Sequence, residues 1–328
     1  MDDSYIPIQD RKQHPTLWFD DGNIVLTTNI SRFRVHRGLL SMNSPVFADM
    51  LSMPQPDRIE DGYEGLPVVE ISDNDADFTH LLRFFYDHRY YQGGTETTFE
   101  KVSGLLRMST KYQVDDLRTE IIAHLSLAYP STLEHYMKAV DPDTQLPLFP
   151  PFHGQHFAVV HLARETDASI LLPAALWRSM CMTTPGILEG TVDSNGTRHM
   201  LPPGDIRICM LTKSQIYKKL VRMESMLTKK GRLGCVRQQQ NGGSGVAPCT
   251  EIATSSVINH FASPGLELVD DNDMFAEMKA FEKWRHLVCH VCRHAADSTL
   301  SSHRTRWWSA LPLFFGLPEW NNSQNASN

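Results

Sequence analysis

The stretch DGNIVLTTNISRFRVHRGLLSMNSPVF, residues 21–47, carries the signals that decide the fold of the first third of the chain. Residues 23–28 are apolar and β-branched, and the alternation that follows places Phe33 and Val35 on one face. Both patterns are typical of half-buried strands. The polar joint at 29–31 suits a hairpin, so we predict two paired strands here.

Helical signals follow the hairpin. Ser44 and Pro45 match the N-cap and the first position of a helix. After a loop that contains prolines and glycines, residues 67–71 form a third strand candidate. Apolar residues at helical spacing then predict three more helices, with starts at Asp73 or Asp75, at Thr97 and at Asp115. This order of elements predicts an α+β domain with a small sheet.

The second half of the sequence predicts a different architecture. It shows almost no alternation, and helical periodicity covers 157–164, 168–182, 205–227 and about 273–296. We therefore expect a mainly α-helical C-terminal domain. The predicted boundaries are an N-terminal segment 1–13, an α+β domain 14–128, a Pro-rich connection 129–151, a helical domain 152–320 with a flexible loop 237–247, and a disordered tail 321–328.

Composition and charge narrow the classes of protein. The 328 residues are 41% hydrophobic and 21% charged, as in ordinary folded proteins, and the formal net charge of −7 does not favour binding to nucleic acid. The N-terminus lacks the pattern of a signal peptide, and no apolar run approaches the roughly 18 residues of a membrane span. We expect an intracellular protein, cytoplasmic or nuclear, with reduced cysteines and no membrane partner.

Two separated stretches carry a family resemblance. Residues 21–47 resemble the opening of BTB/POZ domains, and LRMSTKYQVDDL at 106–117 resembles the helix pair near the end of such domains. Their order and spacing agree over about 14–128. The C-terminal part resembles, less specifically, the helical regions attached to BTB domains in fungal proteins, through residues 171–175, Cys289-x-x-Cys292 and 308–320.

The resemblance implies a docking role. BTB domains commonly homodimerise, and some bring substrates to cullin-based ubiquitin ligases or belong to transcription regulators. The sequence has no kelch repeats and no Cys₂His₂ zinc-finger array, and Ile59-Glu60 lacks the spacing of a cullin-binding signal. We therefore predict a protein–protein interaction protein that acts as a homodimer. A substrate adaptor of a cullin-based ubiquitin ligase is the alternative.

Three charged residues are candidates for partner binding. Asp21, His36 and Arg37 match positions that, in BTB domains, lie near a surface pocket close to the dimer contact. The alternative interpretation is an ordinary ion pair with hydrogen bonds that order the hairpin. Pairs of this kind are common and are rarely functional.

Four of the six cysteines form a candidate metal site. Cys289 and Cys292 lie three apart on one side of an expected helix, and Cys235 and Cys249 lie across the Gly-rich loop. Four thiolates arranged tetrahedrally satisfy Zn²⁺ as a structural ion. Reduced, partly buried cysteines are the alternative. Three histidines are alternative ligands: His286, His290 and His294.

The sequence gives no support for catalysis. No histidine accompanies a GxSxG motif, and residues 241–245 lack the lysine of a phosphate-binding loop. We predict that the protein is not an enzyme and requires no cofactor, with a zinc-dependent enzyme as the least favoured alternative. Cys181 and Cys209 fall inside apolar helical patterns and are predicted core residues.

Overall fold

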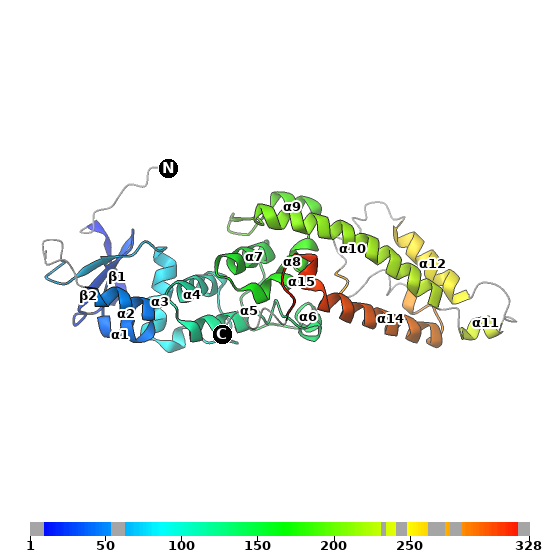
Figure 1. The fold of residues 1–328 in the computed structure, drawn as a ribbon, viewed down its shortest axis with the longest axis horizontal. Coiled ribbons are helices and arrows are strands. Elements are labelled where there is room, and N and C mark those ends of the chain that lie inside the picture. The colour runs from blue at the N-terminus through cyan, green and yellow to red at the C-terminus, as the bar shows by residue number, and fades with distance from the viewer. Residues whose placement is uncertain are drawn as a thin grey trace. The chain divides into compact units, whose positions relative to one another are not determined.

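The chain divides into two units. The computed structural model describes residues 10–53, 63–230, 234–240, 248–261, 273–275 and 284–320 (Figure 1). The first unit contains Met1–Leu125 and Pro147–Pro150, and the second contains Ser126–Leu146 and Pro151–Asn328. The ends of the chain at 1–9 and 321–328 lie outside the described residues.

A four-stranded sheet organises the first unit. Its strands are β1 (Lys12–Trp18), β2 (Ile24–Thr27), β3 (Ser31–Val35) and β4 (Val68–Glu70), in the order β1-β3-β2-β4. The strands β2 and β3 pair antiparallel, with Leu26 opposite Phe33, whereas β1 and β4 are parallel to their neighbours. The predicted hairpin and the predicted third strand are both confirmed.

The strand β1 was not predicted, and its sequence explains why. Pro15 interrupts the run, and a proline lowers the prediction of a strand because it has no N–H to donate. At the edge of a sheet, a residue without an N–H is tolerated. The register with β3 shifts between Gln13 and Trp18, so the pairing is irregular around the proline.

Helices complete the first unit. They are α1 (Arg37–Asn43), α2 (Pro45–Ser52), α3 (Asp75–Tyr86), α4 (Phe99–Lys111) and α5 (Asp115–Leu125), with a 3₁₀ turn at His88–Tyr90. The Ser44 cap is confirmed, because its side chain accepts a hydrogen bond from the backbone N–H of Phe47. Two predicted caps are displaced by one residue, since Asn74 caps α3 and Thr98 caps α4.

Aromatic rings form the core of the first unit. Phe47 stacks on Tyr112 with centroids 4.4 Å apart, and Phe78 packs against both Phe33 and Phe47. All four of these side chains are buried. Because Phe47 and Tyr112 come from the two stretches that carried the family resemblance, the core joins the beginning and the end of this domain.

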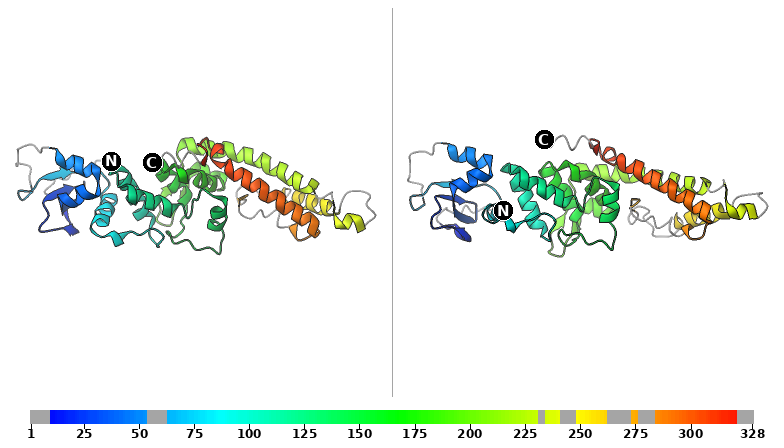
Figure 2. Two further views of the ribbon diagram at one scale, coloured as in Figure 1. Left: turned by 60° about the horizontal axis from the view of Figure 1, so that its bottom comes forward. Right: turned by 90° about the horizontal axis from the view of Figure 1, so that it is seen from below.

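The second unit is almost entirely helical, as predicted. Its helices are α6 (Leu133–Ala139), α7 (Gln155–Glu165), α8 (Leu172–Met180), α9 (Thr184–Glu189), α10 (Pro203–Lys230), α11 (Val236–Gln240), α12 (Pro248–Phe261), α14 (His290–Ser309) and α15 (Leu311–Phe314), with a 3₁₀ turn at Ser169–Leu171 and a short hairpin of β5 (Thr191–Val192) and β6 (Arg198–His199). The helices α10 and α14 lie side by side, and α12 packs along α10 (Figures 1 and 2).

A polar anchor inside an aromatic cluster holds the second unit together. Asp273 Oδ1 accepts hydrogen bonds from Trp177 Nε1 at 2.8 Å and from the Phe275 backbone N–H at 3.0 Å, and the Tyr136 hydroxyl donates to the other carboxylate oxygen. The rings of Trp177, Phe275 and Trp308 pack together around it. Trp308, near the end of the chain, is therefore packed within its own unit.

The expected long helix over about 273–296 is wrong. Asp273 lies outside any helix, and the helix α14 begins only at His290. The carboxylate of Asp273 binds buried donors instead of continuing an apolar helical face. Part of the expected helix, 276–283, lies outside the described residues, and so does 241–247 of the expected flexible loop. Within the described part of the chain, no helix has both the length and the apolarity needed to cross a bilayer.

Candidate functional site

His36 connects the β2–β3 hairpin to the end of α3. Its Nε2 lies 3.2 Å from Asp21 Oδ1, and its Nδ1 lies 2.8 Å from the Tyr86 hydroxyl. That hydroxyl also accepts a hydrogen bond from the backbone N–H of His36 at 3.0 Å, so Tyr86 holds both the backbone and the ring of His36. Burial raises the pKa of Tyr86, which therefore stays protonated at neutral pH.

Arg37 makes contacts of a different kind. Its backbone N–H donates to Asn23 Oδ1 at 2.8 Å, and its guanidinium donates to the Leu51 carbonyl at 2.6 Å. Arg37 therefore fastens α1 to the end of α2. The structure brings Asp21 and His36 together. Arg37 follows His36 in sequence, but its hydrogen bonds go to Asn23 and Leu51 instead. Asp21, which is 84% exposed, is the member of the three that faces solvent most fully.

These contacts support the structural interpretation of the three residues, and their role in partner binding stays a prediction. Sequence reasoning missed Tyr86, which orients His36 from 50 positions away along the chain. The ring of Phe19 stacks on Tyr86 with centroids 4.4 Å apart. No motif links these positions, because the contact depends on how α3 packs beside the hairpin.

The first two helices expose apolar side chains that sequence reasoning also missed. Met42 on α1 is 78% exposed, and Met53, directly after α2, is 63% exposed. Methionine is flexible and polarisable, and it is frequent at surfaces that bind other proteins. Leu40, on the same helix as Met42, is fully buried. The helix α1 thus has an inner side fixed to the core and an outer side that offers an apolar contact.

A comparison with protein families decides the nature of this region. Residues 20–127 match the family model of the BTB/POZ domain. The N-terminal region is a BTB/POZ domain. The α+β fold with a small sheet and the helical region that follows it agree with this assignment, and a BTB/POZ domain is a protein-interaction domain. No match to a curated protein was found for the chain. The likeness of the C-terminal helices to fungal proteins stays a prediction.

Outside the BTB/POZ domain, four cysteines lie together in the second unit. The sulfur atoms of Cys235, Cys249, Cys289 and Cys292 all lie within 4.8 Å of one another. Cys235, Cys249 and Cys292 are buried, Cys289 is half-buried, and none of them forms a disulfide. The prediction that these four cysteines converge is thus met by the geometry, and the cluster is compatible with a metal ion.

The starts of helices position the sulfur atoms. Cys289 is the N-cap of α14 and Cys292 lies in its first turn, while Cys249 is the second residue of α12. Cys235 directly precedes α11, and its carbonyl accepts the N–H of Gln238. The backbone N–H of Cys289 also donates to the sulfur of Cys249 at 3.3 Å. The thiols therefore sit where backbone N–H groups point outward.

The surroundings of the cysteines shift the pKa values of their thiols in opposite directions. Burial acts to raise the pKa of the Cys289 thiol, but the hydrogen bonds that its sulfur accepts from the backbone N–H groups of Cys292 and Val236 outweigh burial and lower the pKa to about 6. Burial raises the pKa of Cys249 and Cys292. The cluster thus holds a thiolate-forming sulfur next to thiols that need a cation to ionise.

The remaining predicted residues lie elsewhere. His286, His290 and His294 are exposed and do not belong to the cysteine cluster. Cys209 is fully buried, as predicted, whereas Cys181, at the end of α8, is half-buried. The metal site therefore rests on cysteine alone.

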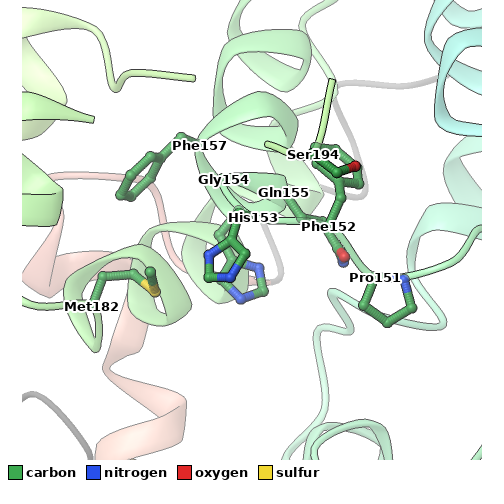
Figure 3. Close-up of a pocket in the computed structure, with 9 residues that line it drawn as sticks. Pro151, Phe152, His153, Gly154, Gln155, Phe157, Met182 and Ser194 are labelled. Carbon is green, nitrogen blue, oxygen red and sulfur yellow. The ribbon is translucent and has the colours of Figure 1, made fainter. Parts of the chain in front are cut away.

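A cavity of about 450 Å³ lies at the start of α7. Figure 3 shows His153, Phe157 and Met182 among the side chains around it. His156 also lines it, and its Nδ1 lies 2.9 Å from the Tyr129 hydroxyl. Burial lowers the pKa of His156 well below its usual value, so the ring is neutral at physiological pH. None of the nine lining residues carries a carboxylate or a thiol.

Proposed function

We propose that this protein acts by self-association and partner docking through its BTB/POZ domain, with two copies of the chain held together at α1 and α2. The observation that carries the proposal is the exposure of Met42 and Met53 at these first two helices of an interaction domain. Exposed methionines are frequent at surfaces that bind other proteins, because the side chain is flexible and polarisable. A second copy offers the same methionines and buries them symmetrically.

The sheet supplies a second contact for the same partner. Among the described residues, β1 is an edge strand that pairs only with β3. The backbone groups on the outer side of such a strand favour pairing with another strand. A stable dimer buries about 1,200–2,000 Å² in total, so we expect the interface to extend beyond the two methionines and to include this edge strand.

The helical region is the part of the chain that selects the partner in this proposal. We place the BTB/POZ domain at 14–128 and the helical domain at 152–320, with 129–151 as the connection. Asp21, with its exposed carboxylate, is the residue of the predicted charged set best placed to contact a docked protein. The protein then works inside the cell, in the cytoplasm or the nucleus, without catalysis and without a cofactor taking part in the interaction.

Light scattering coupled to gel filtration tests the dimer on the full chain at micromolar concentration. We expect twice the mass of one chain for the wild type and for Met137→Glu, a control at a methionine that is 42% exposed on α6. Met42→Glu places a charge in the interface, so we expect the mass of a single chain. A wild-type protein that runs as a monomer at this concentration overturns the proposal.

The alternative, a cullin adaptor, is tested with the same protein. Ile59-Glu60, which lacks the spacing of a cullin-binding signal, lies outside the described residues. Immobilised full-length chain is incubated with a purified cullin N-terminal domain. Retention of the cullin by the wild type identifies an adaptor, whereas a dimer that retains none is a docking protein without this role.

A further inference from the structure

Four cysteines from three separate segments converge in the second unit at a spacing that fits one metal ion. A tetrahedral ion with metal–sulfur bonds of about 2.3 Å places its four sulfurs about 3.8 Å apart. The four sulfur atoms lie within 4.8 Å of one another, so only a small contraction separates the present arrangement from coordination. The segments start at 235, 249 and 289, and chance alone rarely brings four thiols together from such separations.

Burial argues for a cation rather than for four free thiols. The exposed fractions of Cys235, Cys249 and Cys292 are only 1%, 2% and 6%. The backbone N–H of Cys289 is directed at the sulfur of Cys249, which is the hydrogen bond that a thiolate accepts best. Buried thiolates repel one another unless a cation lies between them. The cluster therefore supplies both the donors and the negative charge that a metal ion needs.

We propose that Cys235, Cys249, Cys289 and Cys292 bind one zinc ion as a structural site. This inference is independent of the function proposed for the BTB/POZ domain. Four thiolates prefer soft or borderline metals, and the tetrahedral set of four sulfurs favours zinc. An iron–sulfur cluster places its cysteine ligands around several iron atoms and therefore needs them farther apart. With four protein ligands, no position is left for a water molecule, so the ion holds structure and performs no hydrolysis.

The chain around the cluster is built to hold the ligands in place. Gly234 adopts a left-handed conformation with φ of +82°, which turns the chain directly into Cys235. Arg237 donates to the Leu287 carbonyl at 2.9 Å, so the segment after Cys235 is tied to the segment before Cys289. These contacts keep two ligand-bearing segments together.

A second set of contacts fixes the start of α14. Arg285 pairs with Asp297 at 3.1 Å, and Arg293 donates to the Arg285 carbonyl at 3.0 Å. Because Arg285 precedes the cysteine pair and Asp297 follows it on α14, these contacts set the angle at which the chain enters the helix. The zinc ion then adds one common link between the starts of α11, α12 and α14.

Metal content of the full-length protein tests the proposal. The protein is produced with zinc in the medium, purified without chelators in the presence of a reductant, and analysed by mass spectrometry of the elements. We expect one zinc per chain in the wild type and in Cys181→Ala, the matched control at a cysteine outside the cluster. The double variant Cys289→Ser with Cys292→Ser is expected to lose nearly all bound zinc.

Two further measurements keep the test decisive if the double variant does not fold. Cobalt(II) substituted into the wild type is expected to give the strong visible absorption of tetrahedral thiolate coordination. Cys292→His is expected to retain zinc and to shift the cobalt bands, since imidazole replaces one thiolate. A folded, reduced wild-type protein without zinc overturns the proposal. So does iron in place of zinc, or equal zinc content in the wild type and a folded double variant.

Discussion

The hydroxyl of Ser44 donates a hydrogen bond of 2.6 Å to the backbone carbonyl of Tyr112, 68 positions later in the chain. The same oxygen accepts the backbone N–H of Phe47 at 3.1 Å. One buried side chain thus caps α2 and fastens it to the end of α4. Ser44 and Tyr112 lie in the two stretches that resemble the opening and the closing of a BTB/POZ domain, so this contact joins those stretches in space.

Replacing Ser44 tests this connection. Ser44→Ala removes a helix cap and leaves the buried carbonyl of Tyr112 without its donor, so we expect the free energy of unfolding to fall by about 2–3 kcal/mol. Ser52→Ala is the control, because its hydroxyl makes a local, exposed contact with the Asp49 carbonyl. Urea unfolding followed by circular dichroism measures both variants. Equal midpoints for the two variants would contradict the assigned role of Ser44.

Tyr86 provides a test of the interpretation of the charged residues. Tyr86→Phe removes the hydroxyl that meets both the backbone N–H and Nδ1 of His36, so we expect a loss of about 1–2 kcal/mol in unfolding free energy. Asp21→Asn changes an exposed ion pair, and we expect its unfolding midpoint to stay close to that of the wild type. If Asp21→Asn were the more destabilising change, the ion pair and not the tyrosine would order the hairpin.

Local sequence patterns predicted most of the BTB/POZ domain, because short stretches of sequence determine most of its strands and helix caps. The alternation at Phe33 and Val35 predicts the strand that contains these residues, and the Ser44-Pro45 pair predicts the start of the helix that follows it. The strand β1 was missed because Pro15 hides a parallel pairing that depends on distant residues. Periodicity likewise failed at Asp273, where a polar residue is satisfied by Trp177 and Tyr136 from far earlier in the chain.

The candidate sites also contain features that local sequence predicts and features that depend on the fold. The four cysteines could be proposed together from residue type, since cysteine has few other uses in a reducing compartment. Their placement at the starts of α12 and α14 could not be predicted, because the predicted helix ran through Cys289, whereas α14 begins directly after it. The exposure of Met42 depends on which side of a short helix meets the core. Composition alone gives no information on that orientation.

Asp273 is expected to be the most sensitive polar residue of the helical unit. Asp273→Ala leaves the buried Trp177 and Tyr136 donors without their acceptor, so we expect a loss of about 2–4 kcal/mol in unfolding free energy. Asp143→Ala, at an exposed position of the same unit, is the control. Tryptophan fluorescence during urea unfolding reports on the aromatic cluster directly. A wild-type midpoint for Asp273→Ala would show that the carboxylate is dispensable.

Withdrawal of metal is expected to loosen one region and spare another. Hydrogen exchange of the full chain is compared before and after incubation with a strong chelator. We expect faster exchange in α12 and in the first turns of α14, because zinc binding and local folding are coupled. The amides of α4 and α5 in the BTB/POZ domain serve as the internal control. Acidification should act in the same direction as the chelator, since protons compete with zinc for the thiolates.

His156 gives the helical unit a stability that depends on pH. Burial lowers the pKa of His156 well below the value of 6.5 that it has in an unfolded chain. Below pH 6.5 the unfolded chain therefore binds a proton that the folded chain does not, and stability falls as pH decreases from 6.5 toward the folded-state pKa. The slope from this residue reaches at most about 1.4 kcal/mol per pH unit.

Substitution isolates the contribution of His156. His156→Gln keeps an amide near the Tyr129 hydroxyl and removes the titrating group, so we expect its unfolding free energy to change less between pH 7 and pH 5 than that of the wild type. His161→Gln, at an exposed position on the same helix, should retain the wild-type slope. Urea unfolding at a series of pH values measures all three proteins. If His156→Gln and the wild type lose stability in parallel on acidification, the decrease comes from other groups and His156 is not its source.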